Sequence, residues 1–117
     1  MPTPTEIRLL RQEKALEVAF DDGSLFRLTA EYLRVESPSA EVQGHGPGQK
    51  QVVAGRRHVG IMNVEPVGNY AVRLIFDDLH DTGIFSWDYL YQLGREQEQR
   101  WQAYLDALAA KGLKRDP

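Results

Sequence analysis

Apolar and polar residues alternate along two early stretches of the chain, at residues 7–9 and 16–20. Alternation with a period of two is typical of strands that bury one face. The polar run Asp-Asp-Gly-Ser at 21–24 follows the second stretch, and alternation resumes after it. Gly23 can adopt the positive φ that a tight turn needs without a steric clash. We therefore expect a β-hairpin over residues 15–28.

Two later stretches also predict strands. Residues 72–76 alternate clearly, whereas the extended stretch 59–67 contains Gly60 and Pro66. Proline cannot donate a hydrogen bond to a neighbouring strand, and glycine weakens a strand interior. The stretch 59–67 is therefore expected to be an irregular or edge strand.

Two segments predict helices. Thr29 can cap a short helical turn near residues 29–34 by accepting an otherwise unpaired backbone N–H. Ser86 is a suitable cap for a long helix that continues to about Lys111, and Gly112 suits the left-handed position that follows. One face of this helix carries large apolar residues at helical spacing, namely Leu90, Leu93, Trp101, Tyr104, Leu105 and Leu108.

These elements predict an α+β fold with mainly antiparallel β-sheet and the long C-terminal helix packed on it. The domain is expected to span residues 5–112, with a solvated tail at 113–117. A chain of 117 residues suits one domain and can bury a core without cross-links.

The stretch 36–58 lacks a regular pattern and is rich in glycine, so residues 43–57 are expected to be the most mobile internal segment. Its basic side chains, with no acid between residues 43 and 58, are His45, Lys50, Arg56, Arg57 and His58. Glycine-rich backbone next to cations can receive a phosphate or an acidic partner. The alternative is an ordinary solvated loop, because surface charge needs no partner.

Composition excludes several classes of function. The chain has no cysteine, which excludes thiolate catalysis and cysteine-ligated metals from this chain alone. The net charge of −3 gives no electrostatic support for nucleic-acid binding. No apolar run is long enough for a membrane helix, and the first residues lack the pattern of a secretory signal. A cytoplasmic location is therefore expected.

His80 is the main candidate for chemistry, because Asp77, Asp78 and Asp81 surround it. An imidazole with nearby carboxylates can ligate a divalent metal or act as an acid–base pair. The alternative is a polar turn, where aspartate bonds to local backbone. Trp87, which is followed by two tyrosines, is a candidate for a partner-binding aromatic patch or for core packing.

Two motifs resemble a known family. One is Leu-Arg-Val-Glu-Ser-Pro-Ser-Ala-Glu at 33–41, followed by Gly-His at 44–45. The other is Asp-Thr-Gly-Ile-Phe-Ser-Trp-Asp-Tyr-Leu at 81–90. With the opening hairpin, they resemble the small bacterial DUF971 proteins, also called the γ-butyrobetaine-hydroxylase-like N-terminal domain. The resemblance covers about residues 5–105.

The resemblance implies a module that precedes the catalytic domain of certain dioxygenases and is fused elsewhere to P-loop ATPases of iron–sulfur assembly. In the dioxygenases the module carries a zinc held by three cysteines and a histidine. Those cysteine positions correspond approximately to Ser37, Ser39 and Val42, and the histidine position to His80. Hydroxyls are poor zinc ligands and valine is none, so no zinc site of that kind is expected here.

Three hypotheses follow. The first is a non-catalytic accessory module that binds another protein, with an iron–sulfur assembly factor implied by the resemblance. Its candidate contact residues are His45, Arg56, Arg57 and Trp87. The second is a metal-binding protein in which His80, with its aspartate neighbours, holds iron or zinc. A small-molecule enzyme ranks third, because only the polar cluster near His80 supports it.

Overall fold

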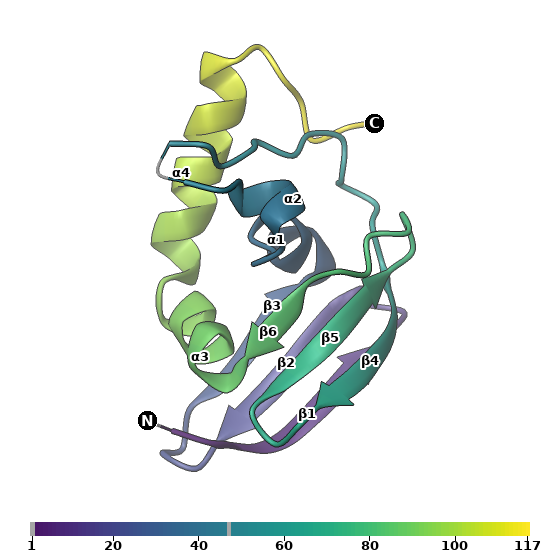
Figure 1. The fold of residues 1–117 in the computed structure, drawn as a ribbon, viewed down its shortest axis with the longest axis vertical. Helices are drawn as coiled ribbons and strands as arrows, with labels where there is room; N and C mark the ends of the chain where they lie inside the picture. The colour runs from purple at the N-terminus through teal and green to yellow at the C-terminus, as the bar shows by residue number, and fades with distance from the viewer. Residues whose placement is uncertain (1, 47) are drawn as a thin grey trace.

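Two antiparallel three-stranded sheets form the body of the protein, as a computed structural model of residues 2–46 and 48–117 shows (Figure 1). The first sheet has the order β1 (Pro4–Leu10), β2 (Ala15–Phe20), β3 (Leu25–Thr29). The second has the order β4 (Ile61–Val67), β5 (Ala71–Phe76), β6 (Ile84–Ser86). The helices are α1 (Ala30–Val35), α2 (Ala40–Gln43), α3 (Trp87–Arg95) and α4 (Gln97–Ala110). The predicted α+β class is confirmed.

The two sheets face each other and share one core (Figure 1). From the first sheet come Leu16, Val18, Phe20 and Leu28, and from the second Val72, Leu74, Phe76 and Phe85. These residues recur every second position along their strands, which is the spacing that places side chains on one face. The alternation seen in the sequence therefore marks the inner face of each sheet.

The turns and edges follow the local sequence signals. Gly23 has a φ of 90° in the β2–β3 turn, as the hairpin prediction requires. Strand β4 is an edge strand with a register irregularity between Ile61 and Asn63, which confirms the prediction for 59–67. Thr29 and Ser86 each accept a backbone N–H at a helix start.

The C-terminal helix is broken, contrary to the expectation of one helix from Ser86 to Lys111. Glu96 has φ −104° and ψ 15°, and it ends α3 and begins α4. Helix α3 buries Leu90 and Leu93 in the main core, whereas Tyr104 of α4 belongs to a second cluster. The break lets each half bury its own apolar face. No helix within the described residues is long and apolar enough to cross a membrane.

The second apolar cluster forms away from the sheets, where α4 meets the irregular segment. Tyr104 and Leu108 pack on Val35, with Val52 and Val53 against them. The Tyr104 hydroxyl also donates a hydrogen bond of 2.6 Å to the Val53 carbonyl. The segment 43–57 thus has apolar and polar anchors that its composition did not reveal, although residue 47 lies outside the described residues.

Helix α1 is buried on every side. All six of its residues are buried, and so is Glu36, which ends it. Its charged side chains are therefore removed from water, and a buried charge is costly unless it is paired. Each has a partner from a distant segment. Glu31 pairs with Arg115 at 2.6 Å, Arg34 with Asp78 at 2.8 Å, and Glu36 with Arg100 at 2.9 Å and also with Lys50.

The last residues lie against the irregular segment rather than in free solvent. The backbone N–H groups of Gly55 and Arg57 donate to the carbonyls of Lys114 and Arg115, at 2.9 and 3.0 Å. Most side chains of 113–117 remain exposed. Arg115 is the exception, because its guanidinium pairs with the buried carboxylate of Glu31.

Gly23→Val should lower the free energy of unfolding by about 1–3 kcal/mol, because a β-branched residue is strained at positive φ. Nothing lies within 4 Å of a Cβ built at this position, so the loss reflects backbone strain and not a clash. Chemical denaturation measures it. Equal stabilities would show that Gly23 does not hold this conformation in solution.

Arg100→Met should lower the free energy of unfolding by about 1–3 kcal/mol, because it removes one of two cations from the buried carboxylate of Glu36. The loss is kept moderate by Lys50, which stays in place. Arg95→Met is the matched control, since Arg95 is exposed, and should change stability by less than about 0.5 kcal/mol. If both variants unfold at the same denaturant concentration, Glu36 does not depend on Arg100.

Candidate functional site

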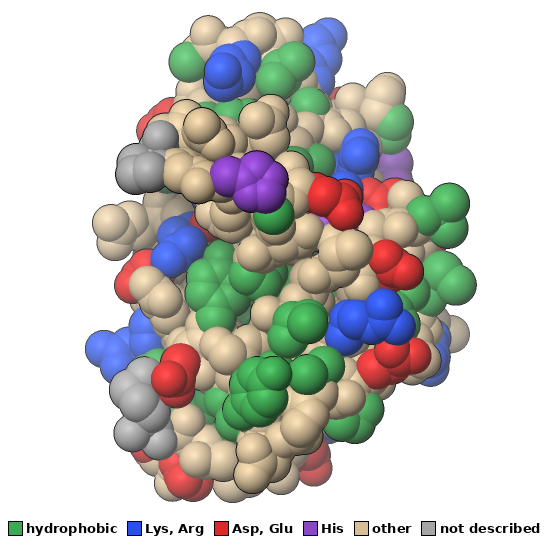
Figure 2. Space-filling model, viewed as in Figure 1, with side chains coloured by type: hydrophobic (Ala, Val, Ile, Leu, Met, Phe, Trp, Pro, Cys, Tyr) green, Lys and Arg blue, Asp and Glu red, His purple; other side chains and the backbone are tan. Residues whose placement is uncertain are grey.

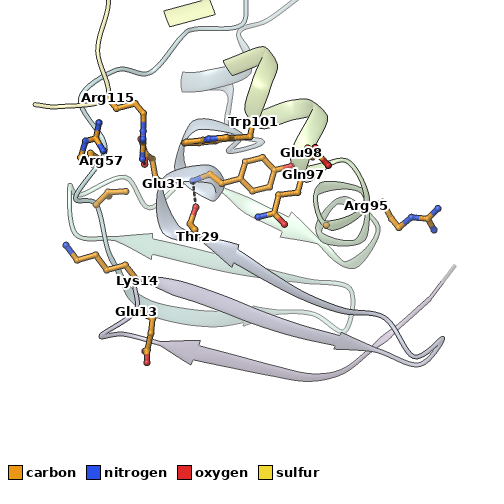
Figure 3. Close-up of a pocket in the computed structure, with 13 residues that line it drawn as sticks. Glu13, Lys14, Thr29, Glu31, Arg57, Arg95, Gln97, Glu98, Trp101 and Arg115 are labelled. Atoms are coloured by element: carbon orange, nitrogen blue, oxygen red, sulfur yellow. Dashed lines mark hydrogen bonds and ion pairs between the residues drawn. The ribbon is translucent and has the colours of Figure 1, made fainter. Parts of the chain in front are cut away.

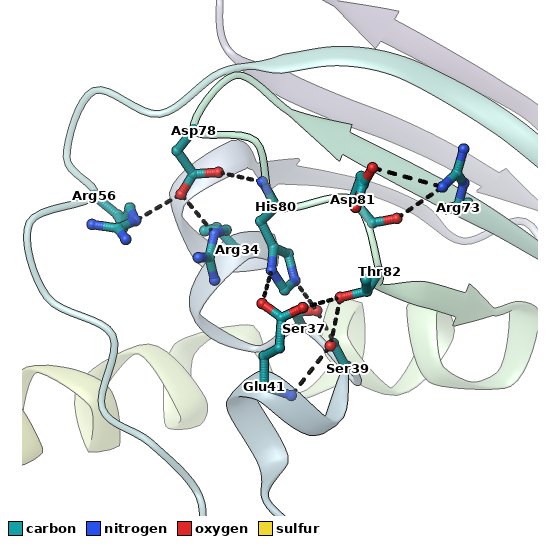
Figure 4. Close-up of polar contacts among 10 residues, drawn as sticks. All are labelled: Arg34, Ser37, Ser39, Glu41, Arg56, Arg73, Asp78, His80, Asp81 and Thr82. Carbon is teal, nitrogen blue, oxygen red and sulfur yellow. Dashed lines mark hydrogen bonds and ion pairs between the residues drawn. The ribbon is translucent and has the colours of Figure 1, made fainter.

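His80 lies in the turn between β5 and β6, with its side chain buried under α2 (Figure 4). Its Nε2 is 2.9 Å from the Ser37 hydroxyl. Its Nδ1 is 3.4 Å from a Glu41 carboxylate oxygen, without the alignment of a good hydrogen bond. The ring is therefore held between two residues of the 36–43 segment.

A chain of side-chain hydrogen bonds continues from this ring (Figure 4). The hydroxyls of Ser39 and Thr82 are 2.7 Å apart, and the Thr82 hydroxyl donates to Glu41 at 2.9 Å. Ser39 also caps α2 by accepting from the Glu41 backbone. A Cβ on Gly83 would lie 2.6 Å from the Ser37 hydroxyl oxygen, so this position must be glycine for the two segments to approach.

The side chain of Asp78, two residues before His80, forms a second set of contacts that fix the same turn. One carboxylate oxygen accepts from Arg34 at 2.8 Å and from Arg56 at 2.7 Å. The other oxygen accepts from the His80 backbone N–H at 3.2 Å. The turn is thus tied to α1 through Arg34 and to the irregular segment through Arg56.

The electrostatic surroundings keep Asp78 charged and His80 neutral. Burial raises the pKa of Asp78, but hydrogen bonds from Arg34, from the His80 backbone and from Arg56 together hold it below its ordinary value. Burial lowers the pKa of His80, and the charge of Arg34 lowers it further. The carboxylates of Glu41 and Asp78 oppose this shift without reversing it.

Ser37, His80 and Glu41 have the connectivity of a hydroxyl–imidazole–carboxylate triad. Ser37 is fully buried, however, and its oxygen also accepts the Ser39 backbone N–H at 3.3 Å. Neither Ser37 nor His80 lines the cleft beside Glu31 and Trp101, the cleft beside Glu36 and Tyr104, or the groove beside Trp87. These contacts are consistent with a structural role, in which His80 fixes the turn between β5 and β6 against Ser37 and Glu41.

The positions that the resemblance aligned with zinc ligands do come together in part. Ser37 and Ser39 belong to the hydrogen-bonded network around His80, and Val42 is buried nearby in sequence on α2. Hydroxyls replace thiolates there, so the residues present do not fit a zinc site of that kind. Across residues 2–46 and 48–117, no three His, Asp or Glu side chains gather closely enough to hold a metal ion.

The aspartates near His80 point to other partners. Asp78 forms ion pairs with Arg34 and Arg56. Asp77 accepts a hydrogen bond of 3.0 Å from the Gly60 backbone N–H. A carboxylate oxygen of Asp81 lies 3.9 Å from the Arg73 guanidinium. A metal held by His80 and these aspartates stays a prediction from the sequence.

The other predicted contact residues are dispersed. Arg56 is engaged by Asp78, and Arg57 pairs with Asp116. His45 is exposed, with its backbone N–H bonded to the Gln49 side chain. Trp87 is half-buried, donates to the Asn69 carbonyl at 2.8 Å and lines an apolar groove between the sheets. The structure does not bring these four into one site.

Sequence reasoning missed Leu79. It lies between Asp78 and His80 with a φ of 73°, a left-handed conformation that suits glycine or asparagine. Its side chain is 84% exposed, the largest value among the exposed large apolar residues of the described chain. On the face of the molecule drawn in Figure 2, apolar side chains form several separate groups. The available signal was a leucine at the centre of a turn otherwise made of polar residues.

Wild-type stability should fall as the pH falls from about 7.5 to 5, partly because of His80. The unfolded chain binds a proton near pH 6.5, whereas burial lowers the pKa of His80 in the folded state. The stabilising contribution of neutral His80 is thus complete above about pH 6.5 and is lost as the pH falls toward the lower folded-state pKa.

Urea denaturation of His80→Gln across this range isolates that contribution, because the amide retains hydrogen-bonding capacity and does not titrate. The variant should lose less stability than the wild type on acidification. The same pH dependence in both proteins would contradict the buried neutral state of His80.

Several solved structures are similar to this chain. Two NMR solution structures are each 47% identical to it and cover all of it, with TM-scores of 0.87 and 0.85; the matches span 92% and 87% of those chains. A crystal structure of a DUF971-family protein of unknown function from Acidithiobacillus ferrooxidans ATCC 23270 is also 47% identical. That match covers 79% of this chain and 92% of the other, with a TM-score of 0.67. No curated protein matches the chain.

The family model described as gamma-butyrobetaine hydroxylase-like, N-terminal, matches residues 7–91. This range contains both motifs that carried the resemblance, at 33–45 and 81–90. The chain therefore belongs to the gamma-butyrobetaine hydroxylase-like N-terminal family, the DUF971 family.

Proposed function

We propose that this protein is a non-catalytic accessory module that binds another protein through the turn at residues 77–81. The observation that carries the proposal is Leu79, an apolar side chain held almost fully in solvent by a left-handed backbone. The partner would present an apolar pocket to this side chain.

The energetics of Leu79 favour a role outside the folded monomer. A left-handed conformation costs a non-glycine residue about 1–2 kcal/mol. The exposed side chain recovers little of this by burial. Such strain persists where the surroundings over-determine the backbone, and it is concentrated at functional sites. Here the flanking residues are fixed by Asp78 on one side and His80 on the other.

A rigid turn is well suited to binding. Ordering a loop at an interface costs free energy, and a segment that is already fixed avoids that cost. The ion pairs of Asp78 with Arg34 and Arg56 supply this rigidity. The buried hydrogen bond between Ser37 and His80 adds to the rigidity of the turn. The network around His80 would therefore have a structural role and not a catalytic one.

The class of partner is proposed from the family resemblance. Modules of this kind are fused to P-loop ATPases of iron–sulfur assembly, so an assembly ATPase is the first partner to test. Metal binding at His80 is the alternative function. Within the described residues no cluster of ligands favours it over the interaction module.

Leu79→Asn tests the proposal, with Leu25→Asn as the matched control. Both leucines are exposed, at 84% and 63%, but Leu25 lies in regular strand β3. Leu79→Asn should raise the free energy of unfolding by about 0.5–1 kcal/mol, because asparagine tolerates the left-handed conformation. Leu25→Asn should leave stability unchanged or lower it by up to about 1 kcal/mol, because asparagine is a poor strand former.

Binding is measured on the same two variants. Leu79→Asn should weaken the affinity for a purified iron–sulfur assembly ATPase at least about tenfold, while Leu25→Asn should bind like the wild type. Calorimetric titration gives both values. A wild-type affinity that survives Leu79→Asn would exclude the turn as the contact. No binding by the wild type would exclude this class of partner.

A further inference from the structure

A cleft of about 740 Å³ is lined in part by Glu31, Trp101 and Arg115 (Figure 3). Its walls come from the β1–β2 turn, the end of β3, the start of α1, the end of α3, the first half of α4 and the segment at residues 57–59. They include Tyr32, Trp101, Gly94 and Gln97. This cleft includes no residue of the turn proposed above.

The cleft contains a built receptor for a guanidinium group. Glu31 is buried, and its two carboxylate oxygens accept from Nε and Nη2 of Arg115 at 2.9 and 2.6 Å. The same guanidinium lies over the Trp101 ring, 5.1 Å from its centroid. A two-point carboxylate contact combined with an aromatic face selects arginine over lysine, because only the planar fork satisfies both.

The backbone and the next side chain of the bound segment are also recognised. Gly55 and Arg57 donate main-chain hydrogen bonds to the carbonyls of Lys114 and Arg115. The Arg57 side chain pairs with Asp116. Gly55 has a φ of 71°, a left-handed conformation that favours glycine, and it lies beside Pro117.

We infer that the receptor formed by Glu31 and Trp101 in this cleft, together with Gly55 and Arg57, is a binding site for a peptide segment in which an aspartate follows an arginine, and that residues 113–117 are bound there in this structure. The arginine fills the receptor formed by Glu31 and Trp101, and the aspartate meets Arg57. A segment of the same chemistry from another protein competes with residues 113–117 for the site. The inference goes beyond the proposed function and depends on different residues.

The test uses the full chain with Arg115→Ala, which vacates the receptor. The probe is an end-blocked hexapeptide with the sequence of residues 112–117, Gly-Leu-Lys-Arg-Asp-Pro. In ¹⁵N-resolved NMR spectra it should shift the Trp101 indole N–H signal and the amide signals of Gly55 and Arg57. A hexapeptide with alanine in place of its arginine is the control and should not shift them.

The wild-type chain should bind the hexapeptide at least about tenfold more weakly than Arg115→Ala, because an attached segment competes at an effective concentration of about 1 mM. Absence of shifts in Arg115→Ala at millimolar peptide would overturn the inference. Equal shifts with the alanine peptide would also overturn it, since the cleft would then not recognise arginine.

Arg115→Ala leaves the buried carboxylate of Glu31 without its partner, and the variant risks unfolding. Arg115→Lys keeps a positive charge there and loses the two-point contact, so residues 113–117 become a weaker competitor. The hexapeptide should shift the Trp101 signal in this variant at about a tenth of the concentration needed for the wild type. Identical titrations of the two chains would contradict the proposed selectivity for arginine.

Discussion

The need to neutralise three charges on a buried helix determines how the rest of the chain is arranged. Helix α1 and its C-cap place Glu31, Arg34 and Glu36 away from water. A charge in such a place is tolerated only with an opposite charge and hydrogen bonds beside it. The partners come from α4, from the irregular segment, from the turn at 77–81 and from the last residues. One short helix thus positions four segments that are distant in sequence.

Both proposed binding sites depend on this helix. Arg34 holds Asp78, and through it the turn that exposes Leu79. Glu31, three residues earlier in the same helix, holds Arg115 in the cleft. The two sites use different charges of α1, and both are also tied to the irregular segment, through Arg56 at the turn and Arg57 at the cleft.

Local signals predicted the fold where the cause is local. The positive φ of Gly23 and the caps at Thr29 and Ser86 follow from single residues and their neighbours. The end of α4 is of the same kind, because Gly112 has a φ of 65° and the Leu113 N–H donates to the Leu108 carbonyl at 2.9 Å.

Features with a tertiary cause were not predicted. Gly94 is a poor helix former, but arginine, glutamate and glutamine follow it and favour a helix, so the sequence alone did not place the break between α3 and α4. The two halves of the helix bury their apolar residues in two different clusters. A sequence alone predicts that Glu31 and Arg34 lie on the surface, because charged side chains are rarely buried. At the site, the sequence identified His80, and the family resemblance aligned Ser37 and Ser39 with it. The backbone of Leu79 had no sequence signature.

The most direct test of the account is the conformation and mobility of Leu79 in the isolated protein. Backbone couplings and ¹⁵N relaxation at neutral pH report both. The account predicts a positive φ and a backbone order parameter of about 0.8 or higher, the value of a rigid element. A negative φ, or an order parameter below about 0.6, would show that the ion pairs of Asp78 and the hydrogen bond between Ser37 and His80 do not hold the turn ready for a partner.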